Sequence, residues 1–550
     1  MEVTRRELFK GGTVLAAGLA ATAATAALGT VGCTSDQPAE ASEWDEEYDV
    51  VVAGAGHGGM TAAVAAAVGG AKVLLMEISS VTAGSTLFSG GYIHSWGLRN
   101  WEEYNSYCRG LHDPVLGKVY VETFWKEYIP WLETLGVPIH RPIPDGNGPR
   151  GYADYAMGTA EDFAQPGRYA IRRYFDELER VLTENGGTVK LRTSAVKLYA
   201  DNDNKIIGLR AKTWTNSPVE EDQQFFNVKA KKVIMATGNF YSNRGMTTTY
   251  ISPYGYALVS CAGPYQRGEG VAMCEEHGAF MSRYTDAFSG NISAWHQDTM
   301  WEDDPEAYEK FLAETPVEEY TVPGKGFASH TGVTSMNNPP VPFNSGGAAA
   351  NAILVNLDGE RFIDESNTVV SSQRRPMYFV IRQPQGMAWV IGDKDSYDAD
   401  EYSKDKLDLI TKKGGNVMIA DTIEELADKM QTEAGVSKIP VIRTINEYNA
   451  AIDAGTTAAL KPPRTPQEQF NKIDNPPFYA VAIRACAYYN FGGLTINGDA
   501  QTLNKQMIPI GNLYSVPPLA GGIMNELYTG GVGISGTFGF RAGRHAAASL

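Results

Sequence analysis

A glycine-rich turn between a buried strand and an apolar helix constrains the fold of this chain more than any other feature. Residues 48–53 (YDVVVA) have the β-branched, apolar composition of a buried parallel strand, and residues 60–68 predict a helix packed on a sheet. Between them, residues 54–59 (GAGHGG) fit the pattern GxGxxG. A second predicted strand, 71–76, ends at Glu77, about 20 residues after the first glycine, where a carboxylate can bind a ribose hydroxyl. In this order the pieces predict a dinucleotide-binding unit.

Each glycine of the pattern has a physical role in this turn. Gly54 permits the tight turn, Gly56 lets the backbone approach a pyrophosphate, and Gly59 lets helix and strand pack closely. The helix that follows presents its N-terminus, which carries a partial positive charge, to the phosphates. We therefore expect the dinucleotide to contact Gly54, Gly56, Gly58, Gly59 and Glu77.

Two further segments are candidates for the same cofactor site. Residues 82–91 (TAGSTLFSGG) offer small side chains and hydroxyls that can surround a flat ring and a pyrophosphate. Residues 231–238 (KKVIMATG) predict a strand that ends in an Ala-Thr-Gly turn, and residues 538–548 predict a last helix. The expected contacts in the first two segments are Gly84, Ser85, Thr86, Ser89, Gly90, Gly91, Ala236, Thr237 and Gly238.

Charge and cysteine content exclude several classes of function. The formal net charge is −17 and no run is rich in Lys and Arg, so a nucleic-acid backbone would be repelled. The five cysteines show no CxxC or CxxCH spacing, which argues against a disulfide framework, an iron–sulfur cluster and covalent haem. The histidines show no HExxH motif. We therefore expect neither a nucleic-acid partner nor a metal site.

The N-terminus has the features of an export signal. Residues 4–10 (TRRELFK) resemble the twin-arginine motif, and an Ala-rich, weakly apolar stretch follows. Because Ala and Thr dominate that stretch, a cleaved signal over residues 1–33 is favoured over a transmembrane anchor. Cys33 ends a degenerate lipoprotein box with Thr30 at the usual aliphatic position, so lipid attachment stays open. Residues 34–47 predict a linker, and we expect the mature chain on the extracytoplasmic face of the cell membrane.

Beyond residue 48 the chain resembles the flavoprotein superfamily of fumarate reductases, urocanate reductases and 3-ketosteroid dehydrogenases. The resemblance rests on the motifs above, the C-terminal block and residues 266–280 (QRGEGVAMCEEHGAF), 352–365 (AILVNLDGERFIDE), 420–430 (ADTIEELADKM) and 477–480 (PFYA). It implies that the dinucleotide is non-covalent FAD. With it we add Val196 and Ser535 to the expected FAD contacts.

The same resemblance implies an α/β architecture in which one domain is inserted into another. A Rossmann-like FAD-binding domain is expected in two sequence pieces, 48–285 and 486–550, with an α+β capping domain at 286–485 between them. The active site is expected where cap meets flavin, since pockets often form at domain interfaces. The acidic, aromatic residues 295–320 are interpreted as part of the cap.

The positions that hold a dicarboxylate in fumarate reductases are altered here. The slot of the family's proton-donating arginine falls on Val369, the substrate-binding histidine pair on Tyr488 and Tyr489, and the late carboxylate-binding arginine on Tyr528. Binding a dianion there would leave buried charge unpaired, which is costly. We therefore expect that fumarate is not the substrate.

Phenols take the place of the missing charges. Tyr528 occupies the position where ketosteroid dehydrogenases bind a 3-keto oxygen, and a tyrosine hydroxyl can donate a hydrogen bond to a neutral carbonyl. Nearby amides, those of Val532 or Gly533, can complete an oxyanion site.

The proton needs a separate donor. Tyr488 or Tyr489 is the expected residue, because a phenol can pass a proton whereas the neighbouring amide of Asn490 cannot. Arg374 and Arg375, together with Tyr378, are the alternatives that follow the Val369 slot.

Taken together, these motifs predict an exported FAD enzyme that reduces a C=C bond conjugated to a carbonyl, by hydride transfer from flavin N5. The direction rests on analogy with anaerobic reductases. The alternatives are desaturation of a ketosteroid, reduction of an unsaturated aryl acid, and electron carriage without turnover. Since the sequence has no haem or cluster motif, electrons are expected from a separate donor such as a membrane cytochrome or a quinol-linked protein.

Overall fold

The computed structural model describes residues 43–141, 154–165, 168–215, 223–260, 263–282, 284–294, 305–316, 327–329, 332–334, 352–365, 376–398, 407, 411, 416–464, 471–525 and 527–550. The chain divides into two units, Met1–Ala39 and Glu40–Leu550, and all described residues belong to the second. The predicted signal over residues 1–33, with Cys33, lies outside the described residues, as does the linker up to residue 42.

The predicted dinucleotide unit forms the centre of an eight-stranded sheet, called the large sheet below. Its path is β18-β19-β9-β1-β2-β6, and β7 and β8 extend it from β9. β1 begins at Glu46, two residues before the predicted strand and within the expected linker. The strands are β1 (Glu46–Ala53), β2 (Val73–Met76), β6 (Thr188–Lys190), β7 (Thr193–Ala200), β8 (Ile206–Thr213), β9 (Gln224–Met235), β18 (Gln501–Leu503) and β19 (Pro509–Ser515).

Parallel pairing brings the predicted cofactor segments to one edge of the large sheet. β1 pairs in parallel with β2 and with β9, so that Ala53 lies opposite both Met76 and Met235. The glycine turn, Glu77 and the Ala-Thr-Gly turn directly follow these three residues. The three segments therefore meet at the carboxyl ends of the strands, where open α/β sheets bind their ligands. The α/β fold expected from the sequence is confirmed.

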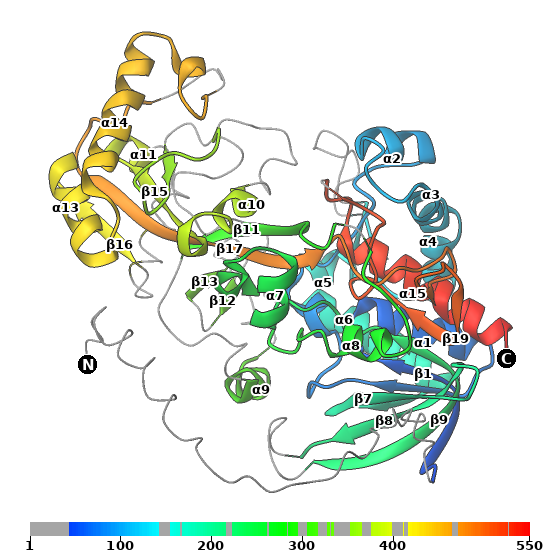
Figure 1. The fold of residues 1–550 in the computed structure, drawn as a ribbon. Coiled ribbons are helices and arrows are strands. Elements are labelled where there is room, and N and C mark those ends of the chain that lie inside the picture. Colours follow the sequence, from blue (N-terminus) through cyan, green and yellow to red (C-terminus); the bar gives the residue numbers. More distant parts are fainter. Residues whose placement is uncertain are drawn as a thin grey trace, which may run out of the picture. The chain divides into compact units, whose positions relative to one another are not determined.

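The last helix begins earlier than predicted. α15 runs over Gly531–Ala548, whereas the sequence pattern predicts a helix only from residue 538. Its glycines let it touch α1 (His57–Val68), because a Cβ on Gly539 would lie 2.1 Å from the carbonyl oxygen of Gly58. Close packing thus outweighs the low helix propensity of glycine. Figure 1 shows the two helices side by side.

A second, six-stranded sheet lies in the expected cap and is called the cap sheet below. Its path is β10-β17-β15-β14, and β11 and β16 also pair with β17. β17 runs from beside α13 (Ile423–Ala434) towards α15 (Figure 1). The expected boundary between residues 485 and 486 falls inside β17, and β10 precedes the expected cap. The strands are β10 (Val259–Ser260), β11 (Phe288–Ala294), β14 (Ile353–Val355), β15 (Met387–Gly392), β16 (Val417–Ala420) and β17 (Phe478–Asn490).

Shorter elements connect and cover the two sheets. A three-stranded sheet has the order β3-β5-β4, and β12 pairs with β13. The remaining elements are η1 (Gly84–Phe88), β3 (Tyr92–Ile93), α2 (Trp101–Tyr107), α3 (Pro114–Thr123), η2 (Phe124–Tyr128), α4 (Ile129–Thr134), β4 (Ile139–His140), β5 (Tyr155–Met157), α5 (Ala160–Ala164), α6 (Tyr169–Glu184), α7 (Arg244–Tyr250), η3 (Gly255–Ala257), α8 (Glu269–Glu275), β12 (Phe327–Ser329), β13 (Gly332–Thr334), α10 (Pro376–Val380), η7 (Pro384–Gly386), α11 (Lys394–Asp398), α14 (Lys438–Asp453) and η8 (Thr457–Ala459).

One helix from the expected cap packs on the large-sheet domain instead. α9 (Pro305–Glu314) lies within residues 295–320, which the sequence analysis assigned to the cap. Its Tyr308 and Leu312, one helical turn apart, are only 3% and 6% exposed and belong to the same buried core as α1 and α15. The apolar face of this helix is therefore buried against the other domain.

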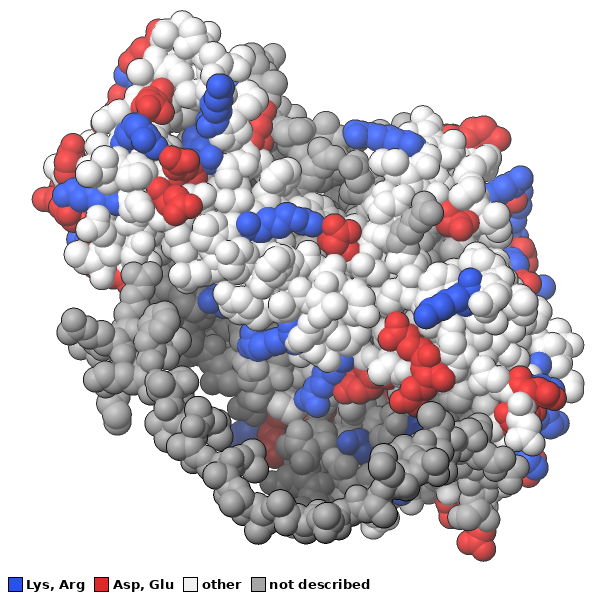
Figure 2. All heavy atoms as spheres, in the orientation of Figure 1, with Lys and Arg blue, Asp and Glu red and all other residues white. Residues whose placement is uncertain are grey.

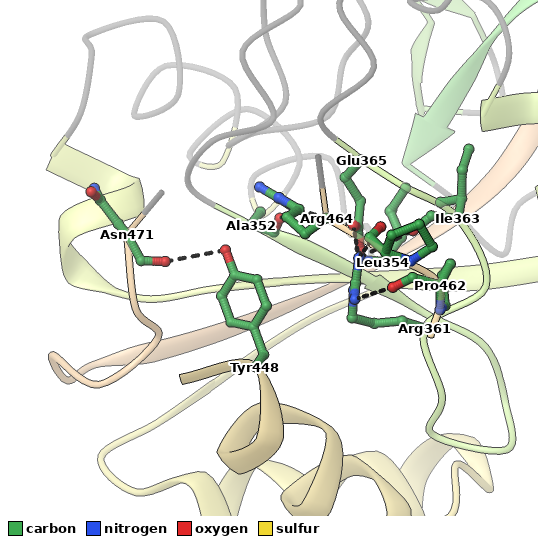
Figure 3. Close-up of polar contacts among 10 residues, drawn as sticks. Ala352, Leu354, Arg361, Ile363, Glu365, Tyr448, Pro462, Arg464 and Asn471 are labelled. Carbon is green, nitrogen blue, oxygen red and sulfur yellow. Dashed lines mark hydrogen bonds and ion pairs between the residues drawn. The ribbon is translucent and has the colours of Figure 1, made fainter. Parts of the chain in front are cut away.

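The motif at residues 359–365 has a structural role within the cap. The buried carboxylate of Glu365 accepts hydrogen bonds from Arg361 Nε and Arg464 Nη1, each at 3.0 Å, and from the amide of Leu354 (Figure 3). Burial alone would raise the pKa of Glu365, but the two guanidinium groups outweigh it and lower that pKa. Tyr448 lies 5.8 and 5.5 Å from the two guanidinium carbons. These contacts fasten β14 to the C-terminal part of the cap.

Cysteine pairing departs from the sequence expectation at one position. Cys486 on β17 is disulfide-bonded, with a partner outside the described residues, whereas Cys108 and Cys274 are buried free thiols. Burial raises the pKa of both free thiols to about 12, so they remain protonated and unreactive. Local spacing could not reveal this bond because it joins residues outside any short motif.

Charges of both signs are interspersed on the face shown in Figure 2. The protein surface carries exposed ion pairs such as Arg382 with Asp286 at 3.0 Å and Arg443 with Glu360 at 2.7 Å. Such pairs stabilise a fold little, and this face presents no extended patch of one sign. Within the described ranges, no helix combines the length and the apolar character that a membrane span needs.

The contact between α1 and α15 yields a stability prediction. Gly539→Ala places a methyl group against the backbone of Gly58, so we expect the melting temperature to fall by a few degrees, the equivalent of about 1–3 kcal/mol of overpacking. Gly245→Ala on the exposed helix α7 is the control, since a Cβ there meets only the side chain of Asn243. Thermal unfolding of the two variants, followed by circular dichroism, measures the difference in melting temperature. Equal melting temperatures would contradict the account of this packing.

Candidate active site

The dinucleotide segments enclose a cavity at the edge of the large sheet. Thirteen of the expected contacts line it: Gly54, Gly56, Gly58, Gly59, Glu77, Gly84, Ser85, Thr86, Val196, Ala236, Thr237, Gly238 and Ser535. Ser89, Gly90 and Gly91 do not. Ser89 instead accepts the amide of Gly91 at 3.1 Å, and a Cβ on Gly91 would face Ile171 and Phe163.

The glycine turn has the shape that a pyrophosphate needs. Gly54 has a φ of +104° and a Cβ there would lie 2.3 Å from the carbonyl oxygen of Ala236, so only glycine fits. Around Gly56 the nearest atom to a Cβ would be 3.9 Å away, which means that a side chain would fill the cavity itself. The hydroxyl of Thr237 is buried in the wall without a hydrogen-bond partner among the described residues. These features fit a bound dinucleotide at the N-terminus of α1.

Glu77 is held for the role predicted from its position. One carboxylate oxygen accepts the amide of Ala55 at 2.7 Å and the other the amide of Ser79 at 3.0 Å. Burial is the main cause that raises the pKa of Glu77 to about 7, against the lowering effect of these hydrogen bonds. Each oxygen retains acceptor capacity, so the carboxylate can also receive ribose hydroxyls.

Sequence reasoning missed a second group of wall residues. Gln266 Nε2 donates a hydrogen bond to the Ser85 hydroxyl, and Gln266 Oε1 accepts the backbone amide of Asn239 at 3.4 Å. The motif at residues 266–280 was recognised, but nothing in it marked which side chains face the cavity. The missed wall residues with polar or aromatic side chains are His57, Ser79, Thr193, Ser194, Lys212, Tyr265, Gln266, Arg267, Glu269 and Tyr308.

His57 occupies one of the variable positions of the GxGxxG pattern, and its side chain joins four elements. Its Nδ1 lies 2.9 Å from the carbonyl oxygen of Val532 on α15 and must therefore donate. Its Nε2 then has one lone pair, which accepts from the hydroxyl of Tyr174 on α6 or of Tyr128 on η2, each 3.0 Å away. Burial lowers the pKa of His57 to about 4, so the ring is neutral. The cofactor turn is thereby tied to the start of α15.

The three tyrosines singled out in the sequence come together. The ring of Tyr528 lies 6.4 Å from that of Tyr488 and 6.5 Å from that of Tyr489, both nearly perpendicular. The rings of His94 and Trp96, which the sequence analysis did not select, also lie beside that of Tyr528, at centroid distances of 6.1 and 5.9 Å. They are called the aromatic cluster below. Tyr528 and Tyr488 are half-buried, whereas the other three side chains are buried.

Ser535 connects the aromatic cluster to the cofactor cavity. It lies in the cavity wall, and its hydroxyl donates to the carbonyl oxygen of Gly531 at 2.8 Å. The hydroxyl of Tyr489 lies 3.4 Å from the same Ser535 oxygen and therefore donates to it. A Cβ on Gly531 would lie 2.4 Å from the Tyr489 ring, so the start of α15 needs glycine to admit this tyrosine.

Of the alternative proton donors, the structure describes only Tyr378. Arg374 and Arg375, with Val369, lie outside the described residues. Tyr378 is described: its hydroxyl donates to the carbonyl oxygen of Phe288 and accepts the amide of the same residue at 2.9 Å. Tyr378 thus joins α10 to β11, and its proton is held by the backbone of Phe288.

The FAD binding domain family matches residues 49–288 and 331–534. The chain belongs to this family. It is 24% identical over 534 residues to the probable fumarate reductase Ifc3 of Shewanella frigidimarina, covering 93% of this chain and 76% of the relative. It is 24% identical over 540 residues to the vinyl phenol reductase of Lactiplantibacillus plantarum, covering 91% and 97%.

Among solved structures, 3-ketosteroid Δ1-dehydrogenase from Sterolibacterium denitrificans shares the fold, with a TM-score of 0.64 and 19% identity over 92% of this chain and 100% of that one. The family match confirms FAD as the cofactor and an FAD-binding fold in two segments, whereas the expected domain bounds, 48–285 and 486–550, stay a prediction. The chain is an FAD-dependent oxidoreductase acting on CH–CH bonds, as the resemblance implied.

The neutral, buried ring of His57 predicts a specific loss of stability in acid. The unfolded chain takes up a proton near pH 6.5 but the folded chain only near pH 4, so the free energy of unfolding falls as pH drops through this window. Between pH 7 and pH 5 we expect a loss of about 2 kcal/mol from this residue. Urea unfolding at both pH values, followed by tryptophan fluorescence, measures the difference.

In His57→Gln that part of the pH dependence disappears, although the variant is less stable at pH 7. His140→Gln, which removes a half-buried ring bonded to the Gly158 carbonyl, is the control for the loss of a histidine elsewhere in the fold. An identical loss between pH 7 and pH 5 in wild type and His57→Gln would show that His57 is not held neutral.

Proposed function

We propose that this FAD enzyme reduces a C=C bond conjugated to a neutral carbonyl group, an enone such as a 4-ene-3-ketosteroid. The observation that carries the proposal is the position of Tyr528, which stands among four aromatic side chains directly before the glycines that begin α15. Bound FAD supplies the hydride. The chain itself holds the carbonyl oxygen, excludes water and delivers a proton.

Hydrogen-bond donors are arranged around the position proposed for the carbonyl oxygen. Tyr528 presents a phenol, and α15 begins three residues later at Gly531. The amides of the first helical turn have no intrahelical acceptor, and the helix dipole adds positive potential there. Donors fixed in a water-poor site stabilise the negative charge that develops on a carbonyl oxygen during hydride addition.

Tyr488 is our preferred proton donor. The hydroxyl of Tyr489 donates to Ser535, and burial raises its pKa far above the ordinary value, so it stays a structural phenol. Tyr488 is half-buried and lies beside Tyr528. Arg374 and Arg375 remain the alternative donors.

One alternative substrate class has its own support. The vinyl phenol reductase among the relatives is named for a phenol that carries a C=C bond, and a cluster of aromatic rings suits a flat aryl substrate. Reduction of an unsaturated aryl compound is therefore the second candidate, and desaturation of a ketosteroid would run the first reaction backwards. Electron carriage without turnover is the remaining candidate.

We also propose a separate electron donor and a location outside the cytoplasm. A relative from Shewanella frigidimarina is named fumarate reductase (cytochrome), which supports a cytochrome or quinol-linked donor for this chain as well. The twin-arginine motif in residues 4–10 supports export, with the mature enzyme at the outer face of the cell membrane. Whether Cys33 carries lipid decides between an anchored and a free form.

Dye-coupled turnover tests the substrate proposal. The holoenzyme is reduced anaerobically with a viologen, and dye oxidation is followed after addition of fumarate, urocanate, a cinnamate, a vinyl phenol or a 4-ene-3-ketosteroid. We expect the ketone to be reduced, with kcat/KM falling about 100-fold in Tyr528→Phe, as when one oxyanion donor is lost. Bound FAD should be unchanged in that variant.

Tyr256→Phe is the matched control, because Tyr256 is 43% exposed and belongs to η3, outside the aromatic cluster. Rapid oxidation by fumarate would refute the argument from the missing arginines. Turnover of the vinyl phenol or cinnamate alone would favour the aryl alternative, and flavin oxidation by none of these compounds would favour electron carriage.

A further inference from the structure

We propose that α9 is a strap across the adenosine end of the FAD cavity, in which Tyr308 and Glu309 slow the release of the bound cofactor. This inference concerns FAD alone and is independent of the proposed substrate. The sequence analysis did not indicate it, because α9 lies within residues 295–320, which were interpreted as part of the cap.

α9 is anchored in the large-sheet domain. Tyr308 and Leu312 bury its apolar face in the core of the large-sheet domain. The ring of Tyr308 lies 5.9 Å from that of Phe88, at the end of η1, and 5.7 Å from that of Tyr265. Tyr308 and Tyr265 both line the FAD cavity, so α9 contributes directly to its wall.

The carboxylate of Glu309 joins two walls of that cavity. One oxygen of its carboxylate accepts the hydroxyl of Tyr265 at 2.7 Å, and the other accepts the amide of Ser80 at 3.2 Å. Ser80 follows the β2 end that carries Glu77, whereas Tyr265 precedes α8. A carboxylate that accepts from both sides holds these two segments together around whatever lies between them.

Glu309 and Glu77 accept hydrogen bonds from adjacent amides. Glu309 accepts the amide of Ser80 at 3.2 Å and Glu77 accepts the amide of Ser79 at 3.0 Å, so the two carboxylates are near neighbours. The negative charge of Glu309 accordingly adds to burial, which is the main cause of the raised pKa of Glu77. Glu77 is the residue placed to bind ribose. The strap therefore lies beside the adenosine half of FAD.

The release rate of FAD tests the strap. Holoenzyme is mixed with an excess of an apoprotein that binds FAD tightly, and the recovery of flavin signal in this trap gives the dissociation rate without any substrate. Tyr265→Phe and Glu309→Gln break the same link from its two ends, the first without changing charge. We expect each to release FAD about tenfold faster, the equivalent of one hydrogen bond to a charged group.

The binding of ADP, which carries only the adenosine half, should weaken in parallel in both variants. Glu314→Gln is the matched control on the same helix, since its exposed carboxylate meets only Lys310 within α9. Release rates that equal the control would overturn the proposal. So would faster release accompanied by an equal fall in the melting temperature of the apoprotein, because α9 would then serve the fold and not the cofactor.

Discussion

The backbone contact between α1 and α15 is the constraint on which the rest of the site depends. Because Gly58 and Gly539 have no side chains, the helix that follows the cofactor turn and the helix that follows Tyr528 touch. His57 fixes this contact by donating to the carbonyl oxygen of Val532. The result is that Ser535 belongs to the cofactor cavity on one side and bonds to Tyr489 on the other. A single packing contact therefore places cofactor and proposed substrate site next to each other.

β17 supplies the other half of the site from the cap. It pairs with β16 and β15 along its first half and with β11 along its second half, so the strand is rigid, and its last residues bring Tyr488 and Tyr489 to Tyr528. Two arginines of the cap have a structural role instead. Arg361 and Arg464 form buried ion pairs with Glu365 and stabilise the fold (Figure 3). Phenols and helix amides at the aromatic cluster suit a neutral carbonyl, because they donate hydrogen bonds without requiring a counter-charge.

The cofactor site could be predicted from sequence because local chemistry fixes its residues. Features that depend on tertiary packing could not be predicted in this way. The glycine turn, Glu77 and the Ala-Thr-Gly turn could be located because each must follow a parallel strand. The start of α15 was missed because glycine reads as loop until its close contact with α1 is known. His57 stood at a position that the motif leaves open, and α9 was assigned by its place in the chain although its buried face belongs to the other domain. Ring contacts from His94 and Trp96 could not be inferred from spacing.

The central claim is that Tyr528 and the first amides of α15 hold a neutral carbonyl oxygen. Isotope-edited infrared difference spectroscopy of a ¹³C-carbonyl-labelled 4-ene-3-ketosteroid bound to the oxidised holoenzyme tests it without turnover. Strong hydrogen bonds weaken the C=O bond, so we predict a stretching band below its frequency in water, and recovery of much of that shift in Tyr528→Phe. A band at the frequency found in water, unchanged by Tyr528→Phe, would contradict the account.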